Sequence, residues 1–543
     1  MSSILSNFPK QYDPNPAQVH ILKDLELAIQ EGHKFIVCNA PTGSGKSLIS
    51  KTLANLSTEP SDEYKELVNS YRAYANDSEG SSKYADELEE MDYAGCTALT
   101  ITKSLQDQYK TIFDDAEVLK GKSNYCCEVD DSVQCDIAPC MLTPAIKKEC
   151  WATNLCPYYE QRNKTLTSVF SALNYSMFFN LPEQLKKREY IVCDEASELE
   201  DEIVKAYTCV IKFKTLKSCG VQLRPVDRST YQKLYRWVES VGISLADRIG
   251  ELKEDLKSKS LQKPAKTSRK KMIVALENLR SRVSSVINTW DETEYVFENI
   301  DDGIQFLPLK VNNLAQNLFK HGKIIILMSA TIIDPKNFCK TLGIEKFKYI
   351  ESESTFDPEK SPIYCTSKVK LNYHNLKSNL PKIVKTIRDI CKEYPDSKGI
   401  IHSHSNYITS YIKNNFKSDR CIFREAGVNN EMVVEEHTNS DYASIIVSPS
   451  LTHGVDLKDD LARFQIIIKA PYLPTTDKRI EQLMKKDFKW YLNKMLCVLI
   501  QASGRGTRSA EDYCDTYVLD GAIAEAVINN KGKLPKYFIE RFA

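Results

Sequence analysis

The feature that most constrains the fold of this 543-residue chain is a glycine-rich turn between a short apolar run and a helix-forming run. Residues 35–38 (Phe-Ile-Val-Cys) predict a buried strand, and residues 48–53 predict a helix. Gly43 and Gly45 in the turn let backbone N–H groups point inward around phosphate oxygens, and the helix N-terminus adds a partial positive charge. A strand, a glycine-rich turn and a helix in this order predict an α/β fold that binds nucleotide phosphates.

The polar side chains of the turn have distinct tasks in such a site. Lys46 would reach the β- and γ-phosphates of ATP, and the Ser47 hydroxyl would ligate Mg²⁺. The strict pattern begins with glycine, whereas this chain has Ala40 at that position. The residues predicted to bind the nucleotide from this turn are Ala40, Thr42, Gly43, Ser44, Gly45, Lys46 and Ser47.

A pair of acids follows a second apolar run, residues 190–193. Asp194 would hold Mg²⁺, and Glu195 would orient and deprotonate the attacking water. Adjacent acids after an apolar run are common by chance. Their occurrence together with the phosphate turn is what favours a nucleotide-hydrolysing site.

The length fits about three to four domains. Lys plus Arg and Asp plus Glu both number 73, so the formal charge is zero, which argues weakly against a basic coat over the whole surface but leaves room for local basic patches. The neutral sum combines residues 61–92, with ten acids and three bases, and residues 253–282, with ten bases and three acids. The chain contains no run of about 18 apolar residues and no apolar core near its start. We therefore expect a cytoplasmic protein without a membrane contact.

Cysteine is the most unevenly distributed residue type. The chain has 17 cysteines, and six of them fall within 31 residues: Cys126, Cys127, Cys135, Cys140, Cys150 and Cys156. An odd number of cysteines argues against a full disulfide framework. In a chain without a signal peptide, such a cluster of cysteines favours metal binding. Thiolates suit either an iron–sulfur cluster or zinc, and the lack of close Cys-x-x-Cys pairs argues against a zinc ribbon. The remaining cysteines are scattered and are interpreted as small core residues.

The string from Asp194 to Ser197 resembles motif II of superfamily 2 helicases, and other segments resemble the remaining motifs in the correct order. These are residues 12–18 (the glutamine motif, with Gln18 for adenine), 100–106 (motif Ia), 328–331 (III), 399–405 (IV), 448–457 (V) and 501–508 (VI).

The cysteine segment resembles one branch of that superfamily, the XPD/DinG family of iron–sulfur helicases. Residues 119–125 precede the cysteines, Cys-Pro-Tyr-Tyr at 156–159 closes them, and Asn-Tyr follows at 174–175. The likeness is greatest to compact DinG-type proteins, including those of bacteriophages, for which the location would be the host cytoplasm. The sequence departs from the family at Ser197, where histidine is usual, and at His453, where glutamate is frequent.

The resemblance implies a [4Fe–4S] cluster bound by four of these cysteines. The expected ligands are Cys127, Cys140, Cys150 and Cys156, with Cys135 as the alternative second ligand and Cys126 as the spare.

The resemblance also implies two RecA-like motor domains with parallel sheets, an iron–sulfur insertion and a mostly helical Arch-like insertion. The expected bounds are 1–205 resuming at 306–345 for the first motor, 122–170 for the iron–sulfur insertion, 206–305 for the Arch-like insertion and 346–543 for the second motor. The apolar residues between 272 and 287 recur at three- and four-residue steps, which predicts a core-facing helix.

The activity implied by the resemblance is an ATP-dependent DNA helicase that moves 5′→3′ on single-stranded DNA and unwinds forked duplexes, in DNA repair or replication. ATP would lie between the motors, and Asp456 would link the nucleotide state to the DNA groove. The residues expected to act in catalysis are Lys46, Asp194, Glu195, Gln501, Arg505 and Arg508.

Two other functions remain open. Ser197 in motif II motivates a DNA-dependent ATPase that remodels protein–DNA complexes without separating strands. A non-catalytic iron–sulfur module that binds DNA or senses redox state is the other alternative. We expect a monomer in which the basic segment 253–282 lies nearer the DNA than the acidic segment 61–92. The acidic segment, a surface insertion with some helix, is a candidate contact for a protein partner.

Overall fold

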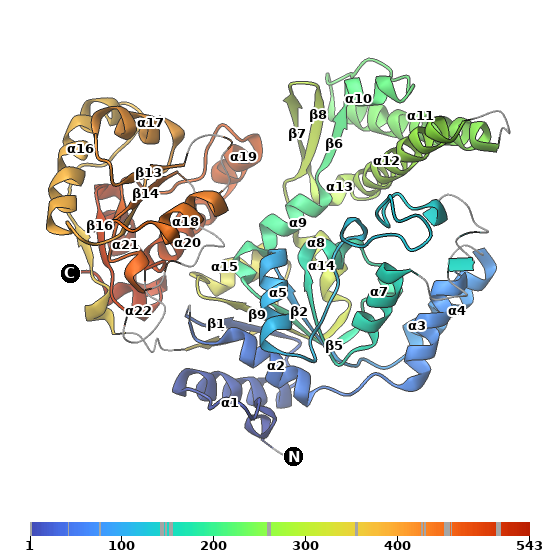
Figure 1. Cartoon of the computed structure of the whole chain (residues 1–543), viewed down its shortest axis with the longest axis horizontal. Helices are drawn as coiled ribbons and strands as arrows, with labels where there is room; N and C mark the ends of the chain where they lie inside the picture. Colours follow the sequence, from blue (N-terminus) through green and yellow to red (C-terminus); the bar gives the residue numbers. More distant parts are fainter. Residues whose placement is uncertain are drawn as a thin grey trace.

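Two large parallel β-sheets and a small antiparallel sheet form the framework of the chain, seen in a computed structural model (Figure 1). This architecture confirms the predicted α/β class. The structure describes residues 3–543 except 42, 75–77, 142–145, 147–148, 151–155, 258–261, 353–356, 425–426, 428–429, 450–456, 458 and 507–511.

The first sheet has seven strands in the order β10-β1-β9-β5-β2-β4-β3, and its strand pairs are parallel. The strands are β1 (Phe35–Asn39), β2 (Cys96–Thr100), β3 (Glu117–Val118), β4 (Phe170–Asn174), β5 (Arg188–Cys193), β9 (Gly322–Ser329) and β10 (Lys348–Glu351). The apolar runs predicted to be strands at 35–38 and 190–193 are β1 and β5. Because β10 pairs with β1, this sheet continues six residues past the expected boundary at 345.

Helices cover both faces of the first sheet, which explains why its strands are continuously apolar. In β1, Val37 faces one core cluster while Ile36 and Cys38 face the other. The helices of this part are α1 (Pro16–Gln30), α2 (Lys46–Leu56), α5 (Lys103–Ile112), α7 (Pro157–Thr167), α8 (Tyr175–Asn180), α9 (Leu199–Tyr207), α14 (Asn312–Phe319) and α15 (Pro335–Thr341).

The second sheet has six strands in the order β11-β16-β15-β12-β14-β13, again parallel. They are β11 (Ile363–Cys365), β12 (Gly399–His402), β13 (Cys421–Phe423), β14 (Ile445–Ser448), β15 (Phe464–Ile467) and β16 (Asp515–Val518). Ile400 and Ile401 fall in different core clusters, so this sheet is also covered on both faces. Its helices are α16 (Leu376–Glu393), α17 (Asn406–Asn415), α18 (Asn430–Asn439), α19 (Lys478–Lys486), α20 (Phe488–Ser503), α21 (Gly521–Asn529) and α22 (Lys536–Ile539).

The insertion between α9 and α14 is mostly helical, as expected. It contains α10 (Phe213–Ser218), α11 (Tyr231–Lys257), α12 (Lys263–Asn288) and α13 (Trp290–Thr293). The residues Ile273, Leu276, Val283 and Val286 of α12 are buried against α11, which explains their periodic spacing. Its three-stranded antiparallel sheet was not predicted, and consists of β6 (Cys209–Lys212), β7 (Tyr295–Ile300) and β8 (Gly303–Pro308).

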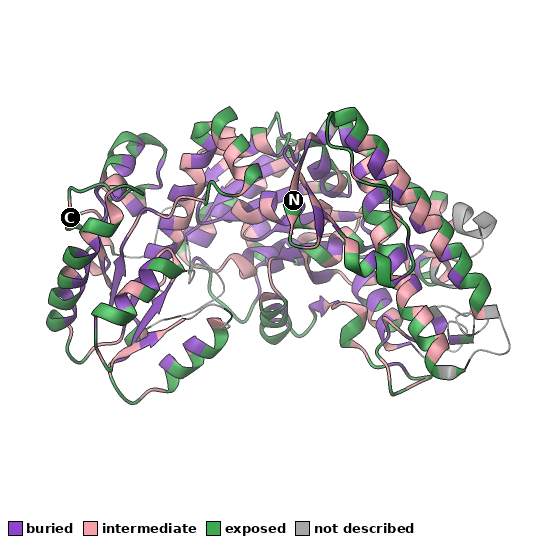
Figure 2. Cartoon of the chain, turned by 90° about the horizontal axis from the view of Figure 1, so that it is seen from above, coloured by how far each residue is buried: buried purple, intermediate pink, exposed green. Residues whose placement is uncertain are grey.

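The acidic segment forms two helices, α3 (Asp62–Tyr74) and α4 (Ser78–Glu90), on the outer side of α7 (Figure 1). Tyr64, Val68 and Leu88 are buried in the same core cluster as the cysteines, so this segment is a docked helical hairpin. Seen from above, buried residues lie on the strands and exposed ones along the outer helix faces (Figure 2). Within the described part of the chain, no helix has both the length and the apolar character needed to cross a membrane.

Candidate nucleotide site between the two sheets

The glycine-rich turn leaves the end of β1 and leads directly into α2. The Ala40 N–H donates to the Ser329 carbonyl at 2.9 Å, which fixes the start of the turn against β9. Gly43 and Gly45 have φ values of 79° and 73°, in the left-handed region that favours glycine. A Cβ on Gly45 would lie 2.2 Å from Gln18 Nε2, so a side chain at this position would displace the Gln18 amide. Lys46 is the first residue of α2.

Gln18 contacts the phosphate turn from α1. Its Nε2 donates to the Gly45 carbonyl at 3.4 Å, and its Oε1 accepts from the Asn15 N–H at 2.9 Å. Asn15 caps α1 by accepting the Gln18 N–H, also at 2.9 Å. These bonds hold the buried side-chain amide of Gln18 beside the turn. Recognition of adenine by Gln18 stays a prediction.

The two acids after β5 have opposite electrostatic environments. The Lys46 ammonium donates to Glu195 Oε1 at 2.9 Å. Burial would raise the pKa of Glu195, but the charge of Lys46 holds that pKa below its ordinary value. Burial raises the pKa of Asp194 to about 6, even though the charge of Lys46 opposes the rise. Glu195 also has a φ of 49°, a strained backbone for a residue with a side chain.

Three hydroxyl groups connect the acids to the strand end that resembles motif III. The Ser197 Oγ lies 3.0 Å from the Ser329 Oγ and 3.0 Å from the Thr331 Oγ1. The Ser329 hydroxyl in turn donates to Glu195 Oε2 at 3.4 Å. The departure from histidine at Ser197 therefore leaves a hydrogen-bonded contact between the two motifs.

The second sheet contributes to the same site through the C-terminal end of α20. Gln501 Nε2 donates to Glu198 Oε1 at 3.4 Å and to Thr331 Oγ1 at 3.5 Å. The positive charge of Arg505 is among the influences that lower the pKa of Glu195. A side chain from the second half of the chain thus bonds to residues next to the acid pair and at the end of β9. Of the other predicted residues, Thr42, Asp456 and Arg508 lie outside the described residues, as does His453.

Two histidines lie in the segment that resembles motif IV: His402, which is buried at the end of β12, and His404, which is half-buried two residues later. His402 Nε2 lies 3.3 Å from Gln465 Oε1 on the neighbouring strand. Burial lowers the pKa of both His402 and His404 to about 4, so both are neutral at pH 7. His404 has a φ of 66°, a second strained position in a motif.

The candidate cluster ligands lie together between β3 and β4. Cys127, Cys135, Cys140, Cys150 and Cys156 are buried in one core cluster, whereas Cys126 is exposed. The Cys127 N–H donates to the Val133 carbonyl and the Cys135 N–H to the Tyr125 carbonyl, at 3.0 and 2.9 Å. Burial raises the pKa of Cys135 to about 12 and that of Cys140 to about 11, and the neighbouring thiols Cys127 and Cys156 add to both rises.

The chemistry of these thiols and their burial in one cluster suit a metal bound by thiolates. The positions of their sulfur atoms in the described part of the chain do not form a coordination site. Among the described residues, no three Cys, His, Asp or Glu side chains are placed to hold a metal ion. Metal binding would have to deprotonate thiols whose pKa is raised. The choice between Cys135 and Cys140 stays open, because both are buried and both are influenced by Cys127 and Cys156.

Sequence reasoning missed several side chains of the site. Tyr175 is fully buried and donates its hydroxyl to the Asp194 carbonyl at 3.0 Å, which fixes the backbone that presents the acid. Glu198 accepts from Gln501, and Thr331 accepts from it too. Two features of the sequence could have revealed these residues: Glu198 follows Asp194 by only four positions, and Tyr175 belongs to the Asn-Tyr string at 174–175. Gln106, expected in motif Ia, is a core residue whose amide donates to the Leu119 and Ala172 carbonyls.

Comparisons with known proteins find helicases among those that this chain resembles. The helicase C-terminal domain family matches residues 389–540. The ATP-dependent DNA helicase XPD of Sulfolobus acidocaldarius is 24% identical over 553 aligned positions, which cover 92% of this chain and 94% of that protein. The ATP-dependent DNA helicase CHL1 of Kluyveromyces lactis is 22% identical, over 70% of this chain and 57% of that protein.

Solved structures show the same fold. A structure titled as an XPD helicase has a TM-score of 0.61 at 15% identity, covering 96% of this chain and 98% of its own. The structure of Xpd4 from S. tokodaii has a TM-score of 0.55 at 17% identity, covering 96% and 99%. The match to the helicase C-terminal domain and the XPD relative support an XPD/DinG-like superfamily 2 helicase and indicate an ATP-hydrolysing enzyme, and the solved structures show the same fold.

Proposed function

We propose that this protein uses ATP hydrolysis to move 5′→3′ along single-stranded DNA and to separate forked duplexes. The observation that supports ATP-driven movement is the division of the site between the two halves of the chain, whereas the 5′→3′ polarity rests on the resemblance to the iron–sulfur helicases alone. Lys46 and Glu195 belong to the first sheet's half of the chain; from the second half, Gln501 bonds to Glu198 and Thr331, and the charge of Arg505 acts on Glu195. A nucleotide bound there would hold the two halves together, and loss of its γ-phosphate would release them.

The residues divide the chemistry between them. Lys46 would leave Glu195 to contact the β- and γ-phosphates, which frees the Glu195 carboxylate to orient and deprotonate the attacking water. Ser47 and Asp194 would hold Mg²⁺, whose charge favours the ionised form of Asp194. Arg505, and Arg508 by the motif, would stabilise charge on the transferred phosphoryl group. Gln501 would report that state to Thr331 and Ser197.

We further propose that Cys127, Cys150, Cys156 and one of Cys135 and Cys140 bind a [4Fe–4S] cluster. The support is the burial of five thiols in one core cluster, next to helix α7 that begins at Pro157. Such a cluster, held by these cysteines, would crosslink the loops between β3 and β4. Iron and sulfide analysis with the visible spectrum of anaerobically purified protein tests this, because a colourless zinc protein would contradict it.

Strand separation on forked DNA tests the proposed activity. Forks with only a 5′ single-stranded arm and forks with only a 3′ arm are compared in the presence of ATP and Mg²⁺. Unwinding of the 5′-armed fork alone supports the proposal, and unwinding of the 3′-armed fork alone reverses the polarity. DNA-stimulated hydrolysis without any strand separation would instead favour a translocase that remodels protein–DNA complexes.

A further inference from the structure

We propose that Arg479 is a positioning residue. It links the base of the insertion, here residues 209–308 from the start of β6 to the end of β8, to the second sheet's half of the chain. The insertion would therefore move together with motif VI. The proposal rests on the proposed function, in that it explains how nucleotide closure reaches a part of the chain remote from ATP. The interface that supports it, between α19, α9 and the end of β8, contains no residue of the catalytic motifs.

Arg479 lies at the start of α19, which belongs to the second sheet's half of the chain, and its exposed fraction is 4%. Its Nη2 donates to Glu200 Oε1 at 2.7 Å, and its Nε donates to the Pro308 carbonyl at 2.7 Å. Glu200 is in α9, immediately before the insertion, and Pro308 is the last residue of β8, where the insertion ends. One guanidinium therefore binds the helix that leads into the insertion and the residue at which the insertion ends.

The rest of this buried cluster is complementary in charge and in hydrogen bonding. Glu200 Oε2 accepts from the Trp490 indole Nε1 at 2.8 Å. Lys494 Nζ lies 2.7 Å from Asp201 Oδ2 and 3.4 Å from Glu200 Oε2. Burial would raise the pKa of Glu200, but the charges of Lys494 and Arg479 hold it at about 2. Two carboxylates thus face two cations, and a buried pair of this kind resists separation.

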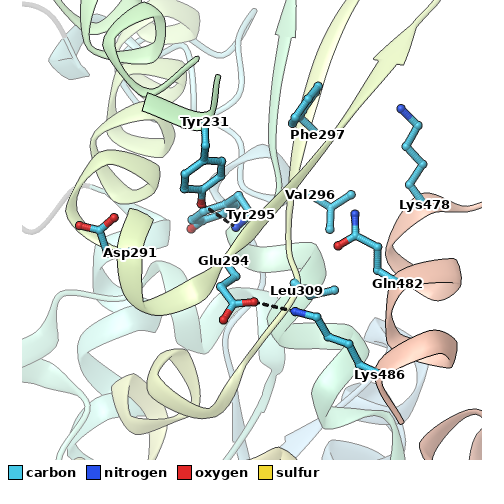
Figure 3. Close-up of a pocket in the computed structure, with 10 residues that line it drawn as sticks. All are labelled: Tyr231, Asp291, Glu294, Tyr295, Val296, Phe297, Leu309, Lys478, Gln482 and Lys486. Carbon is cyan, nitrogen blue, oxygen red and sulfur yellow. Dashed lines mark hydrogen bonds and ion pairs between the residues drawn. The ribbon is translucent and has the colours of Figure 1, made fainter. Parts of the chain in front are cut away.

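A weaker contact lies farther out, where α19 faces β7 (Figure 3). Lys478, Gln482 and Lys486 of α19 line a pocket of about 420 Å³ together with Phe297 and Glu294 of the insertion. Lys486 pairs with Glu294 at 2.8 Å, and the Lys478 N–H donates to Glu298 Oε1 at 2.6 Å. These partners are partly exposed, so solvent screens them and the buried cluster dominates the attachment.

The cluster connects directly to the nucleotide site on both sides. Glu200 follows Asp194 by six residues, and Trp490 and Lys494 are on α20, the single helix that ends beside Gln501. Lys494 precedes Gln501 by about two helical turns. A rotation of α20 on nucleotide binding would therefore move the cluster, and Arg479 would carry the insertion with it.

Arg479→Met removes both donated bonds, and Arg479→Lys keeps the charge without the two-pronged geometry. Lys485→Met is the matched control, because Lys485 lies on the same helix, is exposed, and pairs with Glu481 of that helix. We expect basal ATP hydrolysis to persist in every variant. The number of base pairs unwound per ATP should fall strongly in Arg479→Met, fall less in Arg479→Lys and stay unchanged in Lys485→Met.

A distance measurement separates this role from a purely structural one. Fluorophores on reactive unnatural amino acids at Ser281 of α12 and Lys377 of α16, both exposed, report how the insertion moves relative to the second sheet. Addition of a non-hydrolysable ATP analogue should shift one narrow distance distribution in the wild type and leave a broad distribution in Arg479→Met. If Arg479→Met does not fold, Glu200→Gln carries the same test, because it removes the charge and keeps an acceptor.

The inference would be overturned if Arg479→Met unwound as many base pairs per ATP as the wild type and also gave the same distance distributions. Absence of ATP hydrolysis in the wild type would instead refute the proposed function. In that case the distance measurement still decides whether Arg479 fastens the insertion.

Discussion

Replacing Asp194 by asparagine should stabilise the nucleotide-free protein while abolishing its activity. Burial raises the pKa of Asp194 from an ordinary value of 3.8 to about 6, so at pH 7.5 the ionised carboxylate is held in an unfavourable place. A rise of about 2 in pKa corresponds to about 3 kcal/mol, which is the upper limit of the gain from asparagine. For a domain of roughly 150–250 residues, each kcal/mol shifts the melting temperature by about 2–4 °C.

The sign of the pH dependence follows from the raised pKa. Between about pH 4 and pH 6 the folded state binds the Asp194 proton more readily than the unfolded state does, so stability from this group is lost as the pH rises through about 6. The asparagine side chain of the variant would not titrate. The melting temperature of Asp194→Asn minus that of the wild type should therefore grow from near zero at pH 4 to a plateau above pH 6.

Scanning calorimetry in EDTA, without nucleotide, measures this difference. Glu195→Gln is the matched control with the opposite sign, because the ion pair with Lys46 lowers the pKa of Glu195 and its loss removes a favourable contact. An Asp194→Asn protein no more stable than the wild type at pH 7.5, or a difference that does not change with pH, would refute the electrostatic reasoning. Saturating Mg²⁺ should reduce the difference, since the ion compensates the buried charge.

Three further predictions concern the second sheet's half of the chain. Arg505→Ala should reduce kcat for ATP hydrolysis by about 100-fold or more, and Arg505→Lys should restore only part of it, as steady-state kinetics will show. Trp490→Phe deprives the buried Glu200 carboxylate of an N–H donor and should cost about 1–3 kcal/mol in urea unfolding, with exposed Phe488→Leu as the control. Gly506→Ala should destabilise by about 1–3 kcal/mol, because its Cβ would meet the Cys514 Sγ at 2.3 Å; an unchanged melting curve would contradict the packing seen there.

The sequence predicted those parts of the fold that depend on local chemistry. Gly43 and Gly45 mark a turn whose left-handed φ values favour glycine, and the apolar runs ending at Cys38 and Cys193 fit strands covered on both sheet faces. The periodicity in residues 272–287 predicted the helix α12 correctly. In each case the signal is contained in a short window of the chain.

Long-range packing could not be predicted in the same way. The strand β10 pairs with β1 across more than 300 residues, and nothing in its four residues announces which sheet it joins. Acidic residues of α3 and α4 suggested a surface insertion, but the buried Tyr64 and Val68 that dock it are few among many charges. The contact of Arg479 with Glu200 spans 279 positions and belongs to no motif.

Hydrolysis of ATP by the wild type and by Lys46→Ala, each with and without single-stranded DNA, tests the central claim most directly. We expect single-stranded DNA to raise the wild-type rate of ATP hydrolysis severalfold. Lys46→Ala should be inactive in both conditions, because Lys46 is the cation paired with Glu195. A wild-type rate that single-stranded DNA leaves unchanged, or a Lys46→Ala rate equal to that of the wild type, would contradict it.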